Sequence, residues 1–174
     1  MFNLDISNAQ WENIMSNFLN DIKNICPKIS VDINHCKSYC IGDFIHDGCQ
    51  VIIDKALNKA IAEIDFSLTK SELCSVVFFP GSVNAKCSAV ANKILKFRAR
   101  TFGDVSKIRV EPHLATVNPD FIITPESSWQ EYSIHLKDFM ATDDDWKDFH
   151  ELAFVVDRRS ASKFTMEISD IRIE

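Results

Sequence analysis

The C-terminal two thirds of the chain alternates apolar and polar residues with the two-residue period of β-strands. In the run 95–100, Leu95, Phe97 and Ala99 occupy one phase and three basic residues occupy the other, so one face of this strand is expected to be buried and the other polar. The run 73–79 is almost wholly apolar, as is typical of a strand covered on both sides. Further strands are predicted at 60–68, 107–111, 119–124, 131–136, 151–157 and 163–173. Many short strands without long intervening helices predict an all-β, antiparallel sandwich.

The apolar phases of these strands also predict the core. Its principal members are expected to be Leu95, Phe97, Trp129, Ile134, Leu136, Phe154, Ile168 and Ile171.

The N-terminal segment has a different period. Ser7 and Gln10 have the spacing of a capping box, and apolar residues then recur at steps of three and four until Pro27 ends the segment. We therefore predict an amphipathic helical appendage over residues 1–27 and a β-sandwich domain over residues 28–174. The apolar stripe of the helix could pack on the sandwich, or it could dock on a partner or a second copy.

Residues 28–59 are harder to assign, with short β-like pieces at 29–33 and 50–53 around a segment rich in cysteine and histidine. Cys36, Cys40, His46 and Cys49 are residue types that bind tetrahedral zinc, although their spacing matches no common zinc module. The chain has 6 cysteines, which would form disulfides in an oxidising compartment. We expect reduced structural thiols and no zinc, with the disulfides and the zinc site as alternatives.

Composition narrows the class of partner. The formal charge of -6 disfavours binding to nucleic acid and to anionic membranes. No stretch is apolar for long enough to span a bilayer, and the first residues do not read as a secretory leader. We expect a cytoplasmic protein, and a secreted module whose leader has been removed is the alternative.

Four runs carry a family resemblance, namely 95–100, 129–139, 152–157 and 168–173. In their order and spacing, residues from about 60 to 174 resemble the galactose-binding-like jelly roll of carbohydrate-binding modules. They resemble more loosely the β-sandwich of the mitochondrial complex I assembly-factor family. The resemblance implies a jelly-roll fold and a ligand site on the concave face of one sheet, where polar side chains bind hydroxyl groups beside aromatic rings.

The polar phases of the strands supply the candidates for such a face. Together with Lys96, the candidate ligand-binding residues are Arg98, Arg100, Arg109, Glu111, His135 and Glu167, which we expect to project from one sheet. Trp129 and Tyr132 are expected to pack inward, because their equivalents in the resembling modules usually do. The aromatic half of a sugar-binding platform is therefore not evident from the sequence.

No catalytic motif accompanies this face. The histidines are scattered, and the chain has only 4 glycines with which to form a phosphate-binding loop. Glu111 and Glu167 would form an acid/base pair only if folding brought them together, and ion pairs with the arginines are the preferred interpretation.

The run Thr142-Asp143-Asp144-Asp145 offers oxygen ligands for a structural calcium ion, which some of the resembling modules carry. We instead expect Asp143 or Asp144 to cap a short helical turn that continues to His150. No cofactor is expected.

These features predict a non-catalytic β-sandwich domain that recognises a glycan or another polar ligand. The alternative is an intracellular protein-interaction or assembly domain that uses the sandwich and the N-terminal helix. A small hydrolase is the third class.

Overall fold

The computed structural model describes residues 29–40, 48–80 and 93–174, and the side chains of 48–79 and 93–174. Its strands are β1 (Ile29–Cys40), β2 (Cys49–Asp54), β3 (Lys59–Asp65), β4 (Leu73–Pro80), β5 (Ile94–Val105), β6 (Ile108–His113), β7 (Phe121–Ile123), β8 (Gln130–His135), β9 (Glu151–Asp157) and β10 (Ala161–Ile173). Each run for which a strand was expected contains one, so the all-β class is confirmed. None of the helices in the described ranges could cross a bilayer.

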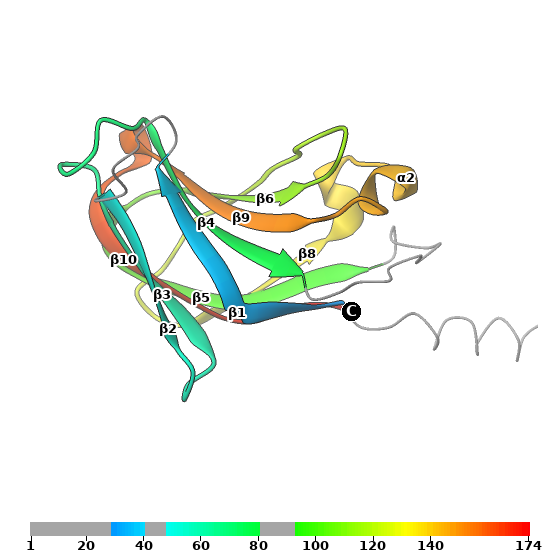
Figure 1. Cartoon of the computed structure of the whole chain (residues 1–174), viewed down its shortest axis with the longest axis horizontal. Coiled ribbons are helices and arrows are strands. Elements are labelled where there is room, and N and C mark those ends of the chain that lie inside the picture. Colours follow the sequence, from blue (N-terminus) through cyan, green and yellow to red (C-terminus); the bar gives the residue numbers. More distant parts are fainter. Residues whose placement is uncertain (1–28, 41–47, 81–92) are drawn as a thin grey trace, which may run out of the picture.

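The strands form two antiparallel layers (Figure 1). Sheet A has the order β2-β3-β10-β5-β8, and sheet B has the order β1-β4-β9-β6-β7. Strand β1 joins the layers, because its first residues pair with the end of β10 and its second half pairs with β4. Neighbours in the sheets are mostly distant in sequence, so the face of sheet A collects side chains from both halves of the chain.

The main core lies between the two sheets and consists of the apolar phases of their strands. Phe97 is fully buried at its centre, stacked on Tyr132 at 5.0 Å between ring centroids and packed edge-to-face on Phe154 at 5.1 Å. Leu95, Phe97, Ile134, Leu136, Phe154, Ile168 and Ile171 are all buried, as predicted. Trp129 is the exception among the predicted core residues, and its position is described with the site.

A second apolar cluster occupies the other side of sheet B. Val77, Ala153 and Val155 are buried there, on the phases of β4 and β9 that point away from the main core, with Leu73 and Phe79 packed against them. Because Cys74, Val76 and Phe78 on the opposite phase of β4 belong to the main core, β4 is apolar and buried on both faces, as predicted.

Short helical turns close one end of the sandwich: η3 (Leu136–Phe139) and α2 (Asp143–Trp146). Thr142 caps α2 through a capping box with Asp145, and the buried Trp146 packs on Phe139. The expected turn is therefore present, but the prediction that Asp143 or Asp144 caps it was wrong. The Thr142 hydroxyl is the acceptor of a free backbone N–H at the start of the turn.

Other expectations at the N-terminal side have mixed outcomes. The N-terminal helix and His46 lie outside the described residues, whereas Cys36 and Cys40 lie in β1. Cys49 is buried in β2. The strand expected to reach residue 68 ends at Asp65, and among residues 66–68 only Phe66 is buried.

Candidate ligand-binding face

The outward side chains of sheet A line up in rows that cross the strands. Gln50 pairs with Glu63, Glu63 with Thr165, and Thr165 with Phe102, so these residues form one row over β2, β3, β10 and β5. Adjacent strands lie roughly 4.8 Å apart, so the row spans roughly 14 Å. An amide, a carboxylate, a hydroxyl and an aromatic ring thus lie side by side, brought together only by the strand order.

A groove of about 520 Å³ follows this row. The row itself, Asp65, Leu68, Gly103 and Lys163 line it. The ring of Phe102 is 44% exposed and Leu68 is 59% exposed, so the groove offers apolar surface beside its polar groups. Gly103 has φ of 109°, and a Cβ there would lie 2.6 Å from the carbonyl oxygen of Lys163, so glycine is required where β5 approaches β10.

A charged cluster is centred on Glu167, which lies in the next row beside Ile61 and Arg100. Glu167 is 8% exposed, and its Oε2 accepts hydrogen bonds from Lys59 Nζ at 3.2 Å and Arg100 Nε at 2.9 Å. The Arg100 Nη2 lies 2.8 Å from the same oxygen. A carboxylate this buried requires such partners, and the cluster holds the Arg100 guanidinium in one place on the face.

Two aromatic rings flank that guanidinium. The Cζ atom of Arg100 lies 4.9 Å from the ring centre of Phe102 and 4.8 Å from that of Trp129, and Arg98 also lies over Trp129 at 5.3 Å. Cation–π attraction favours this stack and orders both rings. The prediction that Trp129 packs inward was wrong, because the residue precedes β8 and lies beside the outward arginines of β5. Tyr132 does pack against the core.

Hydrogen bonds lower the pKa of Asp65, whose carboxyl group lines the groove. Its carboxylate accepts hydrogen bonds from the side chain and backbone of Ser67 and lies 3.0 Å from Lys163 Nζ. These bonds, led by that of the Ser67 hydroxyl, lower the pKa of Asp65 from 3.8 to about 2. Asp65 is therefore an ionised hydrogen-bond acceptor at all physiological pH values.

The candidate residues divide between the two sheets. Arg98, Arg100, His135 and Glu167 do lie on the outer face of sheet A, with Lys96. Arg109 and Glu111 lie on β6 in sheet B, paired with each other at 3.2 Å, so the expectation of a single face was wrong for these two. Alternation fixes the phase of a strand but not the sheet to which it belongs.

The six candidates also differ in their distance from the groove. Arg100 and Glu167 lie in the row next to it, whereas His135 pairs with Ile94 at the other end of β5, roughly 20 Å from Arg100 along the strand.

Sequence reasoning missed most of the groove. Gln50, Glu63, Asp65, Phe102 and Thr165 were not singled out, although alternation from Phe97 through Thr101 would have placed Phe102 outward. The run 95–100 on which the prediction rests stops short of Phe102, whereas β5 continues to Val105.

These positions bear on two of the chemical alternatives, namely an acid/base pair and a metal site. Glu111 and Glu167 lie on different sheets, so they do not form an acid/base pair. Within the described ranges, no three His, Cys, Asp or Glu side chains are grouped as metal ligands, and Asp145 is bonded to Thr142 and Thr116.

Comparison with solved structures finds the same sandwich fold in several carbohydrate-binding modules. The family 11 module from Clostridium thermocellum, in complex with a β-1,3-1,4-mixed-linked tetrasaccharide, matches with a TM-score of 0.59 and 14% identity over 84% of this chain and 94% of its own. The family 30 module of a cellulosomal cellulase from Clostridium thermocellum matches with a TM-score of 0.54 and 18% identity over 86% and 95%. A family 4 module matches with a TM-score of 0.51 and 15% identity over 81% and 94%. The chain therefore has the jelly-roll fold of these modules, as the resemblance implied.

Sequence comparison adds no closer relative. No family model and no curated protein matches the chain.

Proposed function

We propose that this chain is a non-catalytic domain that binds a glycan on the outer face of sheet A. The observation that carries the proposal is the row Gln50, Glu63, Thr165 and Phe102, which lines a groove of about 520 Å³. The fold shared with carbohydrate-binding modules, one of them complexed with a tetrasaccharide, supports it.

The chemistry of the row suits a sugar chain lying across the strands. Carboxylate and amide oxygens accept hydrogen bonds from hydroxyl groups, and Gln50 and Thr165 can also donate them. The exposed ring of Phe102 offers a flat apolar surface to the C–H face of a pyranose, and Leu68 offers another. Arg100 and Trp129 extend the surface toward β8.

Asp65 does not supply the general acid that glycoside hydrolysis requires. A general acid needs a carboxyl group that is protonated near neutral pH. Hydrogen bonds hold the pKa of Asp65 at about 2 instead, so this carboxylate accepts hydrogen bonds and does not donate a proton.

A glycan panel screened by calorimetry tests the proposal, beginning with the mixed-linked tetrasaccharide. We expect Phe102→Ala to weaken binding about 30-fold, the loss that accompanies removal of a dominant aromatic contact. Ile122→Ala is the matched control, because Ile122 is 53% exposed but lies on β7 in sheet B. Equal affinity of wild type and Phe102→Ala, or weaker binding by Ile122→Ala, would contradict the assignment of the face.

The protein-interaction alternative gives a different result in the same screen. The N-terminal helix on which this alternative depends lies outside the described residues, so binding measurements are needed to test it. Binding of no glycan in the panel, with a protein partner whose binding depends on Phe102, would support it.

A further inference from the structure

The loop between β3 and β4, residues 66–72, forms one wall of the groove through Leu68. Some side chains of the loop are buried and others are exposed. Phe66, Thr69 and Ser71 are buried, whereas Leu68 is 59% exposed. The position of the wall therefore depends on what holds the buried side of the loop.

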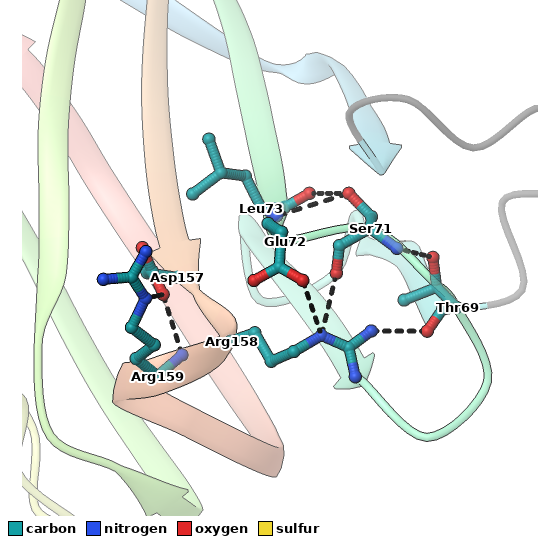
Figure 2. A network of polar contacts seen from close by, with 7 residues as sticks. All are labelled: Thr69, Ser71, Glu72, Leu73, Asp157, Arg158 and Arg159. Carbon is teal, nitrogen blue, oxygen red and sulfur yellow. Dashed lines mark hydrogen bonds and ion pairs between the residues drawn. The ribbon is translucent and has the colours of Figure 1, made fainter.

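Arg158 provides that hold from a distant part of the chain. It lies in η4 (Arg158–Ser160), between β9 and β10, and its side chain reaches across to the loop (Figure 2). Its Nε donates to the Ser71 carbonyl at 3.1 Å and its Nη2 donates to the Thr69 carbonyl at 2.5 Å. Figure 2 shows these bonds beside the contact with Glu72, whose carboxylate lies 3.8 Å away.

Further contacts fix the same loop. The Arg158 guanidinium lies 5.4 Å from the ring centre of Phe66, and the Arg158 backbone N–H donates to the Glu72 carbonyl at 2.9 Å. A Cβ at Gly48 would lie 2.4 Å from the Thr69 methyl group, so the residue before β2 lies directly against the loop. The loop thus packs closely on Gly48 and is held by a guanidinium whose planar fork matches two carbonyls and a ring at once.

We propose that Arg158 is a positioning residue for the groove: it holds the 66–72 loop so that Leu68 forms the wall of the ligand site. The proposal rests on the proposed function, because the wall matters for affinity only if the groove binds a glycan. A lysine at 158 keeps the charge but cannot donate to both carbonyls while covering Phe66.

The test compares Arg158→Lys with Arg159→Lys, which changes the next residue in the chain. Arg159 is 87% exposed in its side chain and contacts only Asp157 among the groups shown in Figure 2. We expect Arg158→Lys to speed hydrogen exchange of the backbone amides in 66–73 by about 10-fold, the loss of about one charge-assisted hydrogen bond. Tetrasaccharide binding should weaken by a similar factor, and Arg159→Lys should change neither.

A second variant keeps the test decisive if Arg158→Lys does not fold. Leu68→Ala removes the wall without touching the anchor, and it should weaken tetrasaccharide binding about 10-fold with unchanged exchange in the loop.

Each outcome bears on a separate claim. Wild-type exchange in the loop of Arg158→Lys would overturn the anchoring role, and unchanged affinity in Leu68→Ala would overturn the role of the wall. If the wild-type protein binds no glycan in the panel, the proposed function fails and with it the role of the wall in affinity. Faster loop exchange in Arg158→Lys would then still establish the anchor.

Discussion

Replacing Glu167 with glutamine should destabilise the protein more than any other isosteric change on the outer face of sheet A. The Glu167 residue is 8% exposed, and a single oxygen accepts from both Lys59 and Arg100. Glutamine keeps the shape and can place its one oxygen in the position of Oε2, but it removes the negative charge that pairs with the two cations. Two charge-assisted hydrogen bonds are weakened, each worth about 1.5–3 kcal/mol.

The expected cost in free energy of unfolding is about 2–4 kcal/mol, slightly below the 3–5 kcal/mol typical when one member of a fully buried pair is removed. The reduction is due to Arg100, whose side chain is 29% exposed and can regain contact with water. Urea unfolding measures this as a lower midpoint with an unchanged slope.

Two controls make the result specific. Glu131→Gln removes a carboxylate that is 55% exposed and lies 3.9 Å from Arg172, so it should cost under about 0.5 kcal/mol. Adding Lys59→Met to Glu167→Gln should cost less than the sum of the two changes, because one of the stranded cations is then absent. A Glu167→Gln variant as stable as wild type would refute the reasoning that this cluster is a coupled, buried unit.

Three further changes test other parts of the structure. Phe97→Ala should lower the free energy of unfolding by about 3–5 kcal/mol, because Phe97 is fully buried between Tyr132 and Phe154; denaturant unfolding measures it, and a wild-type midpoint would show that the phase of β5 is misassigned. Thr142→Ala should cost about 1 kcal/mol through loss of the α2 cap, and Thr142→Ser should restore most of it in the same assay. The pKa of Asp65 is about 2 in the folded protein and 3.8 ordinarily, so its contribution to stability is present above about pH 4 and is lost as the pH falls toward 2. Unfolding curves of Asp65→Asn should lack that part of the acid dependence. An unchanged acid profile would contradict the cause given for the lowered pKa.

The fold was predictable because alternation is a local signal. Leu95, Phe97 and Ala99 are buried and the basic residues between them face outward because the pleat imposes a period of two. The apolar run of β4 likewise predicted burial on both faces. The ends of the strands were predicted less well than their phases. Glycine is a typical turn residue, but Gly103 lies within β5. The apolar alternation of β3 continues to Leu68, but the strand ends at Asp65.

The site could be predicted only in part, because it depends on which strands are neighbours. Arg109 and Glu111 have the same outward phase as Arg98 and Arg100, but β6 pairs with β9 in sheet B. The groove row joins β2 and β3 to β10 and β5, which no local pattern reveals. Trp129 has the phase of the exposed Glu131 and Ser133, so alternation continued back from β8 would have placed it outward, beside the arginines of β5.

Backbone amide chemical shifts recorded during titration with the mixed-linked tetrasaccharide test the central claim most directly. If sheet A binds the glycan as proposed, the largest shift changes will map to Gln50, Glu63, Phe102, Gly103 and Thr165, with smaller changes at Arg100 and Trp129. Changes centred on Arg109 and Glu111 in sheet B, or a saturating titration that leaves the groove residues unmoved, would contradict it.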